Sequence, residues 1–553
     1  MDSENLFNIK LTNNQGKKWV TYGNCHIKGY AFHNDEILEG RFLLDVILES
    51  IESKKLDSVL KELNGNFTAV IIIDSSAYLI SDKLRSYPLI FTLQKDGKWF
   101  ITDSAIGIDN NKNVNRNIDT LNSIEFLSLG YVSGNETLFE DVLTVDAGEY
   151  VILRKGAYIQ RSSYFKYIFD KKVFNKGKTI EDAYKSLEKA FQRTIASIPS
   201  GKQIIIPLSG GYDSRLIACL CKKYGLKDVV CYTYGRYDSF EVSISRKVAD
   251  QLGFKWYYIE YQAENFAKTL CREHFNDFTK FTNNCNSIPH VQEFLALQEL
   301  RSQGILQEGS IVIPGFCGDL FGGSKVPPEV FNWKKNKFNH KNFSRLIYQH
   351  FYDLNIPNTK WKNKIINKIR SEIGDYDVSN QEKFLNHYEQ WCISNRLSKY
   401  IINSLRVYEF FGLDWRMPLW DDNYARLWYQ VPWYDKSPAL LADFMFNKYF
   451  IPYKVDIRKT ESSNSQKTLV FLVKKLLPVN LYNVVKKLHR TITINHDAKD
   501  FNCFEETSKI LSRNISKNTI DAHISKFKDN NILATIARYE LPIIFDDNPV
   551  HSH

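Results

Sequence analysis

The chain has 553 residues, 43% of them hydrophobic and 25% charged, which is typical of a folded protein of several domains and excludes a disordered chain. The net charge of +10 is mild for this length and not gathered into one strong patch, so no nucleic-acid partner is expected. The nine scattered cysteines are typical of free thiols in a reducing compartment. Neither a secretory signal nor an apolar run of membrane-spanning length is seen, so we expect a cytoplasmic location.

The first part of the chain, to about residue 165, has the alternating pattern of half-buried strands. Such runs lie at 69–73, 77–80, 89–92 and 150–153, with turn signals at 64–66 and 95–97. The stretch 43–63 instead repeats its apolar residues at helical spacing. This pattern predicts an α+β domain built on antiparallel sheets.

From about residue 178 apolar strands alternate with helices. The pattern predicts helices at 180–198 and 240–252, and strands at 204–208, 229–234 and 256–259. Buried strands that alternate with helices indicate an α/β domain with a doubly wound parallel sheet. After about residue 335 the sequence is mostly of helical type. We therefore predict three parts, at residues 1–170, 171–465 and 466–553.

One motif lies between the strand at 204–208 and the helix that follows it: Pro207-Leu208-Ser209-Gly210-Gly211-Tyr212-Asp213-Ser214-Arg215. Its glycines let a phosphate approach the backbone closely, and the helix directs its positive N-terminal end to the same place. Ser209 and Ser214 add hydroxyl donors, and Arg215 adds a positive charge. Asp213 would repel phosphate directly, so we interpret it as a ligand of Mg²⁺. The motif lacks the Gly-Lys-Ser/Thr ending of a Walker loop, and it predicts a pyrophosphate-binding loop of another kind.

This motif resembles the pyrophosphate loop of the N-type ATP pyrophosphatases, and the chain resembles their asparagine synthetase branch from about residue 20 to 460. The segment 313–323, Ile-Pro-Gly-Phe-Cys-Gly-Asp-Leu-Phe-Gly-Gly, is similar to the family's Gly-x-Gly-x-Asp-Glu-Leu-Phe-Gly-Gly motif, shortened by about one residue. The segment 414–421 is similar to its Glu-x-Arg-x-Pro-Phe-Leu-Asp motif. The segments at 64–67, 82–89, 130–139 and 148–150 resemble signatures of its glutaminase domain.

The resemblance implies a binding site for ATP and Mg²⁺. Adenine would lie against the backbone near Pro207, Tyr232, Thr233 and Gly315. The phosphates would lie on the loop, at Leu208, Ser209, Gly210, Gly211, Ser214 and Arg215. The metal would be held by Asp213 and Asp319, while Lys459 falls where the family places a lysine that stabilises the departing pyrophosphate.

Two departures from the family pattern bear on function. A working glutaminase domain of this family needs a cysteine as its first residue after Met removal, and this chain has Asp2, with Cys25 the nearest cysteine. A carboxylate cannot replace the thiolate, so we expect a degenerate N-terminal-nucleophile (Ntn) hydrolase-like domain. The synthetase half lacks the family's glutamate near Phe316, so conversion of aspartate to asparagine is not expected.

We therefore expect a carbon–nitrogen ligase that cleaves ATP to AMP and pyrophosphate, adenylates a small-molecule or sugar-linked carboxylate, and passes the acyl group to ammonia or an amine. Surface polysaccharide or natural-product synthesis are candidate settings. The alternatives are a lasso-peptide or β-lactam-type cyclase, a degenerate homologue that binds nucleotide or a partner without turnover, and a tRNA-modifying pyrophosphatase. The resemblance at the N-terminus and the absence of a concentrated basic face speak against the last.

The stretch 470–488 is basic and amphipathic, which fits either a helix in weak contact with an anionic membrane or a helix packed on the synthetase half. A helical C-terminal extension is expected in both cases. A homodimer is left open.

Overall fold

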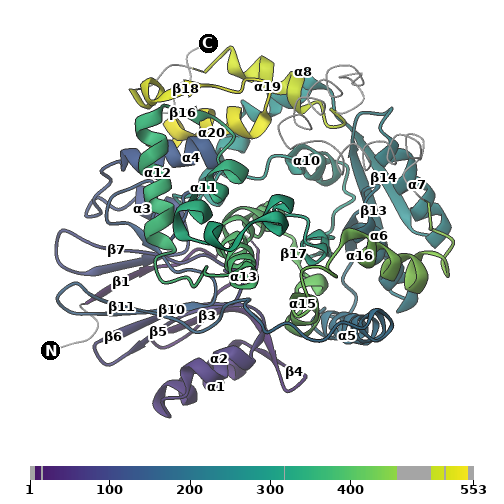
Figure 1. Ribbon diagram of the computed structural model, residues 1–553, viewed down its shortest axis with the longest axis horizontal. Coiled ribbons are helices and arrows are strands. Elements are labelled where there is room, and N and C mark those ends of the chain that lie inside the picture. Colours follow the sequence, from purple (N-terminus) through teal and green to yellow (C-terminus); the bar gives the residue numbers. More distant parts are fainter. Residues whose placement is uncertain (1–5, 14–15, 317, 458–499, 516–518, 546–553) are drawn as a thin grey trace.

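The computed structural model describes residues 6–13, 16–316, 318–457, 500–515 and 519–545. Strands of the N-terminal part occupy one side of the molecule, and a second sheet occupies the other, with helices between and above them (Figure 1). The predicted basic helix at 470–488 and Lys459 both lie outside the described residues. None of the helices in the described ranges is both long and apolar enough to cross a membrane.

The N-terminal part contains two sheets, of seven and four strands. The larger sheet has the order β11-β10-β6-β5-β3-β2, with β4 paired to β3, and the smaller has the order β1-β8-β7-β9. All pairings are antiparallel except that of β1 with β8. The strands are β1 (Phe7–Lys10), β2 (Val20–Tyr22), β3 (Cys25–His33), β4 (Glu36–Glu39), β5 (Asn64–Ile73), β6 (Ser76–Ser81), β7 (Ile90–Leu93), β8 (Trp99–Thr102), β9 (Leu143–Thr144), β10 (Glu149–Arg154) and β11 (Tyr158–Ser163).

The alternating pattern of β5 explains how this part is layered. Val70 packs with Phe91 and Trp99 in a core that both sheets share. Its neighbours Ala69 and Ile71 point to the other face, where they pack with residues of α1 (Gly40–Glu52) and α2 (Leu56–Glu62). A strand places successive side chains on opposite faces, so one apolar strand serves two cores. The predicted antiparallel sheets with helices are confirmed.

Two local predictions for this part are wrong. The stretch 43–63 is not one helix, because α1 ends at Glu52, the chain turns through Lys54 with a left-handed φ of 59°, and α2 begins at Leu56. The predicted turn at 64–66 is the start of β5. Gly65 lies there because the neighbouring strand β3 is so close that a Cβ would come within 2.4 Å of the Tyr30 carbonyl oxygen.

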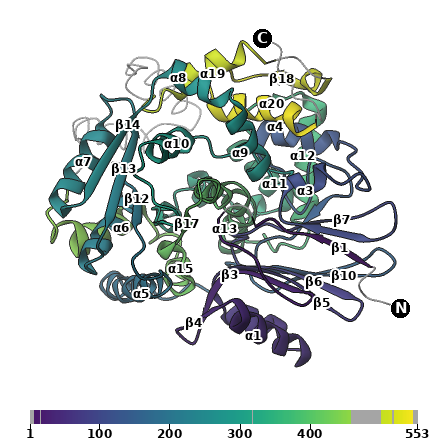
Figure 2. The ribbon, with the colours of Figure 1, turned by 180° about the vertical axis from the view of Figure 1, so that it is seen from behind.

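The second sheet has five parallel strands in the order β14-β13-β12-β15-β17. The chain therefore starts in the middle at β12, proceeds to one edge and then returns to the other side (Figure 2). The strands are β12 (Ile204–Pro207), β13 (Val229–Gly235), β14 (Lys255–Glu260), β15 (Ile311–Val312) and β17 (Asp414–Trp415). In such a sheet ligands bind at the carboxyl edge where the strand order reverses, here between β12 and β15.

Helices cover this sheet and fill the space between it and the N-terminal sheets. Those that accompany the parallel strands are α5 (Lys176–Ala196), α6 (Tyr212–Lys223), α7 (Phe240–Leu252), α8 (Ala263–Leu270), α9 (Glu273–Thr282) and α10 (Phe294–Ser302). Later helices are α11 (His340–Phe351), α12 (Thr359–Glu372), α13 (Gln381–Cys392), α14 (Arg406–Phe410), α15 (Asp422–Tyr429) and α16 (Pro438–Met445). The predicted parallel sheet with helices is confirmed, and α7 has the predicted bounds.

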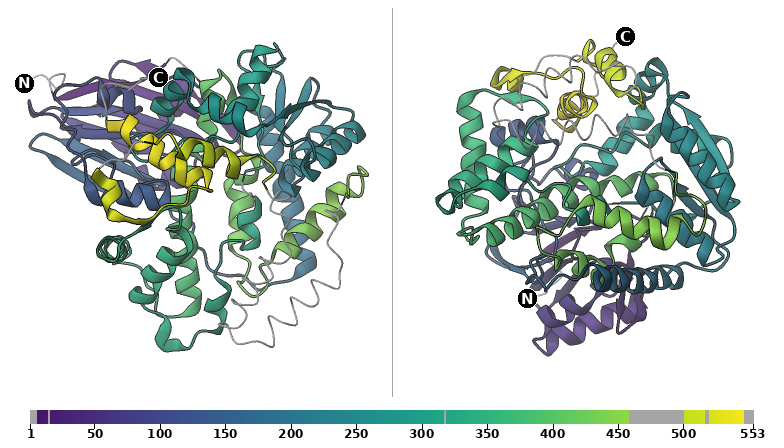
Figure 3. Two further views of the ribbon diagram at one scale, coloured as in Figure 1. Left: turned by 90° about the horizontal axis from the view of Figure 1, so that it is seen from above. Right: turned by 45° about the vertical axis from the view of Figure 1, so that its right-hand side comes forward.

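The described C-terminal residues pack on both earlier parts. Helix α19 (Phe504–Ser512) lies beside α8, and α20 (Ile532–Phe545) lies beside α4 (Thr120–Leu129) of the N-terminal part (Figure 3). The short strand β18 (Ile524–Lys526) pairs with β16 (Ile356–Pro357), and the Cys503 thiol contacts the Tyr261 carbonyl oxygen at 3.1 Å. The predicted limits at residues 170 and 465 stay a prediction.

Arg416 joins the end of α5, strand β17 and strand β3 at one buried point. Its Nε and Nη2 donate to the Ser197 hydroxyl and carbonyl after α5, both at 2.8 Å, and its Nη1 donates to Asp414 of β17 at 2.8 Å. Its guanidinium also lies over the ring of Tyr30 on β3, 4.7 Å from the centroid. Within the predicted motif at 414–421, Arg416 therefore has a structural role.

We expect Arg416→Ala to lower the free energy of unfolding by about 3 kcal/mol, because Asp414 would lose its ion-pair partner and the Ser197 hydroxyl and carbonyl would lose the guanidinium donors. Arg416→Lys, which keeps the charge and loses the fork, should give a smaller loss. Urea unfolding followed by tryptophan fluorescence measures both. Arg41→Ala on the exposed face of α1 is the control, with an expected change of about 0.5 kcal/mol or less. Equal stability of the Arg416→Ala and Arg41→Ala proteins would contradict this role.

Candidate active site

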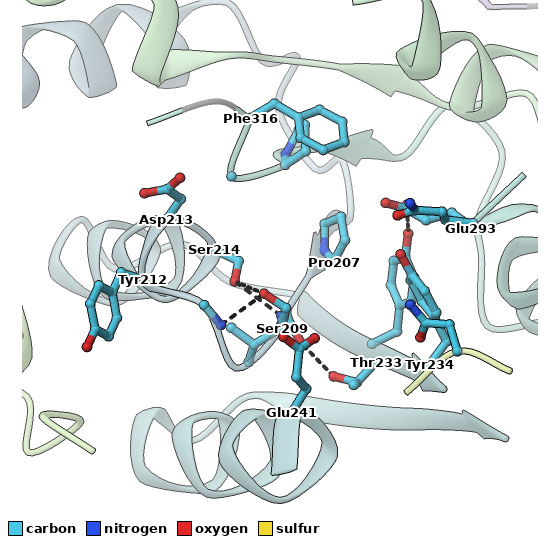
Figure 4. Close-up of a pocket in the computed structure, with 17 residues that line it drawn as sticks. Pro207, Ser209, Tyr212, Asp213, Ser214, Thr233, Tyr234, Glu241, Glu293 and Phe316 are labelled. Atoms are coloured by element: carbon cyan, nitrogen blue, oxygen red, sulfur yellow. Dashed lines mark hydrogen bonds between the residues drawn. The ribbon is translucent and has the colours of Figure 1, made fainter. Parts of the chain in front are cut away.

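The predicted pyrophosphate loop follows β12 and leads into α6. Its shape is fixed by its two serines (Figure 4). The Ser209 amide donates to the Ser214 hydroxyl, the two hydroxyls are 3.1 Å apart, and the Gly211 amide donates to the Ser209 hydroxyl. Gly211 is the residue before the first turn of α6, so the amides of the loop and the helix start gather at one place. Such an arrangement attracts anions.

A cavity of about 320 Å³ opens beside this loop at the carboxyl edge of β12 and β13. This volume is in the range of small-molecule sites, about 300–1,000 Å³. Most of the predicted binding residues line it: Pro207, Leu208, Ser209, Gly211, Asp213, Ser214, Tyr232, Thr233 and Gly315. Residues from two parallel strands (β12 and β13), from α6 and from the loop after β15 thus meet at this pocket.

Asp213 and Asp319, the two predicted metal ligands, lie against each other. The Asp319 amide donates to Asp213 Oδ2 at 3.2 Å, and the Ser324 hydroxyl donates to Asp319 Oδ2 at 2.9 Å. Burial, followed by the negative charge of Asp319, raises the pKa of Asp213 to about 7. Mg²⁺ is usually held by one or two carboxylates together with substrate phosphates. Two adjacent carboxylates at the mouth of an anion-binding loop fit that description.

The close approach of these two segments depends on glycine. A Cβ on Gly315 would come within 2.5 Å of the Ser214 amide nitrogen, and one on Gly318 within 2.6 Å of Asp213 Oδ1. A larger residue at either position would push the loop after β15 away from α6. The glycines of this motif therefore set the distance between Asp213 and Asp319.

Arg215 does not contact the pocket, so the prediction that it adds a charge at the phosphates is wrong. Its side chain is fully buried. Nη1 donates to the carbonyls of Val455 at 3.1 Å and Ile457 at 2.7 Å, and Nη2 donates to the carbonyl of Gly210 at 3.2 Å. Position 215 is one helical turn past the loop and faces the protein interior. Arg215 instead joins the loop to Val455 and Ile457, which precede Lys459 by four and two residues.

Four polar residues of the pocket wall were not predicted as site residues: Glu241, Gln292, Glu293 and Asn502. Glu241 begins α7, whose start is capped by the Ser239 hydroxyl. The signal that could have indicated Glu241 is that α7 follows β13, whose carboxyl end meets that of β12. No comparable signal exists for Glu293 and Asn502, which reach the pocket through packing of distant segments.

The remaining chemistry-bearing groups do not form a metal centre. The cysteines in the described part of the chain are free, with Cys219 and Cys221 both buried in α6. No group of three or more His, Cys, Asp or Glu side chains among the described residues is placed to hold a metal ion. The pair of Asp213 and Asp319 thus stands as a two-carboxylate arrangement that a phosphate would have to complete.

The pKa of Asp213 is raised to about 7 in the folded protein. Between about pH 4 and 7 the folded protein therefore keeps a proton on Asp213 that the unfolded chain releases. The free energy of unfolding consequently falls as the pH rises through this range. Asp213→Asn removes this effect. We expect the ligand-free variant to melt at a higher temperature than wild type at pH 8, with the difference vanishing near pH 4. Differential scanning fluorimetry measures this, with Asp250→Asn on the exposed face of α7 as control. A lower melting temperature for Asp213→Asn at pH 8 would contradict the electrostatic account.

Comparison with known proteins shows similarity to one protein family. The asparagine synthase family model matches residues 186–449, which include the loop, both aspartates and α6 to α16. No curated protein matches the chain.

Several solved structures show distant similarity. An NH3-dependent NAD synthetase from Campylobacter jejuni subsp. jejuni is 14% identical, with 38% of this chain and 99% of that chain covered and a TM-score of 0.19. An NMN synthetase from Francisella tularensis is 14% identical, with 40% and 95% covered and a TM-score of 0.19. A glutamine phosphoribosylpyrophosphate amidotransferase from B. subtilis is 11% identical, with 55% and 59% covered and a TM-score of 0.17. Similarity at this level carries no argument about the chemistry of this chain. The chain is thus similar to the asparagine synthase family over residues 186–449, a little under half of its length.

Proposed function

We propose that this protein is an ATP-dependent ligase that adenylates a carboxylate, releases pyrophosphate, and joins the acyl group to ammonia or an amine as an amide. The observation that carries the proposal is the single pocket in which the serine–glycine loop at the start of α6 meets Asp213 and, beside it, Asp319. The similarity to the asparagine synthase family supports amide formation with ATP as the energy source.

In this proposal the loop binds the terminal phosphates of ATP. The amides of Ser209 and Gly211 donate to serine hydroxyls within the loop. Phosphate oxygens could replace these hydroxyls as acceptors, so that no amide of the loop would be left unpaired when ATP binds. Adenine would lie along the backbone of Pro207, Tyr232–Thr233 and Gly315. Asp213 and Asp319 would hold Mg²⁺, which when bound neutralises charge on the phosphates.

Lys459 is proposed to stabilise the leaving pyrophosphate. It lies outside the described residues, but the chain two residues earlier is joined to the loop by the bond from Arg215 to Ile457. A preorganised cation near the leaving group stabilises charge that develops in the transition state.

We also propose that residues 1–170 are a degenerate Ntn glutaminase-like domain, that 171–465 are the ATP pyrophosphatase-type synthetase domain, and that 466–553 are a helical extension. Cys25 is the cysteine nearest to the N-terminus, at the start of β3, and burial raises the pKa of its thiol. A cysteine with a raised pKa is a poor nucleophile at neutral pH. Ammonia or an amine would therefore come from solution or from a partner.

The carboxylate is proposed to be a small molecule or to be linked to a sugar. Contact of the basic stretch at 470–488 with an anionic membrane would suit a lipid-linked sugar, and a homodimer remains part of the proposal. A liposome flotation assay with anionic lipid tests the membrane contact, and failure of the intact protein to float would remove it.

We expect ATP–pyrophosphate exchange with at least one member of a panel that includes L-aspartate, D-glucuronate and D-galacturonate. Asp213→Ala should reduce this exchange by about 100-fold or more, because charge on the phosphates would lose a metal ligand. Asp250→Ala on the exposed face of α7 is the matched control and should keep wild-type exchange. Tight binding of Mg-ATP without exchange or AMP release, in the presence of ammonium, would instead indicate a homologue that binds nucleotide without turnover.

Purified protein should release no ammonia from glutamine, and Cys25→Ala should leave ammonium-dependent amide formation unchanged, because no activated thiol is available in the N-terminal domain. A coupled glutamate dehydrogenase assay measures ammonia release. Glutamine-dependent release that Cys25→Ala abolishes would overturn the degenerate reading of this domain.

A further inference from the structure

One residue of the pocket wall comes from the C-terminal part of the chain. Asn502 lines the same cavity as the phosphate loop and the carboxyl end of β13. It lies beyond residue 449, where the match to the asparagine synthase family ends. Figure 4 shows the yellow C-terminal segment beside Tyr234, on the other side of the pocket from Asp213. The pocket is therefore completed by a segment from outside the part of the chain that resembles the family.

The segment that carries Asn502 is fixed to the carboxyl end of β13. The Arg236 amide donates to the Phe501 carbonyl at 2.6 Å, and the Phe501 ring packs edge-on against the first residue of α7, with centroids 4.7 Å apart. On the other side of Asn502, the Cys503 thiol contacts the Tyr261 carbonyl oxygen at 3.1 Å. Asn502 is thus held between two anchored neighbours, which gives it a defined place in the pocket wall.

Gly235, the last residue of β13, allows this close approach. Its φ is 124°, in the region that favours glycine. A Cβ at this position would come within 2.6 Å of the Phe501 carbonyl oxygen and 2.8 Å of the Asn502 carboxamide oxygen. Gly235 follows Thr233 by two residues along β13, and the adenine is proposed to lie beside the backbone of Thr233. The carboxamide of Asn502 therefore lies next to the strand end that would hold the base.

The Asn502 carboxamide is available to a ligand. In the described part of the chain no residue forms a hydrogen bond with it. A carboxamide offers an acceptor and a donor side by side. The edge of adenine offers the complementary pair, a 6-amino donor and a ring-nitrogen acceptor, whereas guanine offers two acceptors at its N7 and O6. The phosphates need no such group, because the amides of the loop and the pair of Asp213 and Asp319 serve that end of the pocket.

We propose that Asn502 reads the base of the bound nucleotide. Its carboxamide oxygen accepts a hydrogen bond from the 6-amino group of adenine, and its carboxamide nitrogen donates to a neighbouring ring nitrogen. This inference rests on the proposed binding of ATP in this pocket, and it adds the residue that selects adenine. The C-terminal part of the chain thereby contributes directly to nucleotide specificity.

The test measures binding alone, so it does not depend on turnover. Isothermal titration calorimetry with the full-length protein compares Mg-ATP with the magnesium complex of purine riboside triphosphate, which lacks the 6-amino group. The wild-type protein is expected to bind ATP about tenfold more tightly than this analogue, since a paired donor and acceptor discriminate between bases by about that factor.

Asn502→Ala should weaken the binding of ATP by about tenfold and bring the affinities for ATP and the analogue within about twofold of each other. A variant that is only less well folded would lose affinity for both nucleotides and keep their ratio. Asn514→Ala, at an exposed position just after α19, is the matched control and should keep the wild-type preference.

Two results would overturn the base contact. One is equal affinity of the wild-type protein for ATP and the analogue, and the other is a loss in Asn502→Ala that falls equally on both nucleotides. Preferential binding of ATP that Asn502→Ala abolishes, without pyrophosphate exchange for any carboxylate, would support the base contact and remove the ligase proposal. Absence of ATP binding by the wild-type protein would overturn both.

Discussion

The site depends on the contact between the loop after β15 and the first turn of α6. Gly315 and Gly318 bring these segments so close that the Asp319 amide donates to Asp213. Burial, followed by the negative charge of Asp319, raises the pKa of Asp213. The fold maintains this unfavourable pair because β12 and β15 are neighbours in the parallel sheet and present their carboxyl ends at the same edge. A divalent cation bound with a polyphosphate would relieve the repulsion between the two carboxylates, which links the energetics of this pair to the proposed use of the pocket.

A second buried carboxylate, Glu293, lies on the other side of the pocket from Asp213. Glu293 is buried with phenol donors and no cation among the described residues, whereas Arg193 pairs with Asp421 at 2.7 Å and Lys436 with Glu389 at 3.0 Å. Buried carboxylates without a paired cation also lie outside the pocket, at Asp82 and Glu540. What distinguishes Glu293 from these two is its place in the pocket wall.

Much of the frame could be predicted from the sequence because it follows from periodicity and local turn chemistry. The strands at 204–208, 229–234 and 256–259 and the helix at 240–252 were expected nearly as the structure has them, since apolar strands of a parallel sheet are continuous and unmistakable. The loop at 207–215 was found for the same reason. The break at Lys54 was missed because apolar spacing continues across it from α1 into α2.

What the sequence could not provide is the outcome of long-range packing. The phenols that hold Glu293 lie 61 and 115 residues away along the chain, and no local pattern connects them. Arg215 was assigned to phosphate from its place in the motif, but its side chain points inward to carbonyls about 240 residues further on. Gly65 gave a turn signal, whereas the need for glycine there arises from the neighbouring strand.

The most direct test of the central claim is to identify the nucleotide products by phosphorus NMR when the protein turns over ATP with an accepted carboxylate and ammonium. The account predicts AMP and pyrophosphate in equal amounts, matched by the amount of amide formed, and neither product from Asp213→Ala. Formation of ADP and inorganic phosphate would contradict it, because cleavage would then occur at the γ-phosphate and no acyl-adenylate would form.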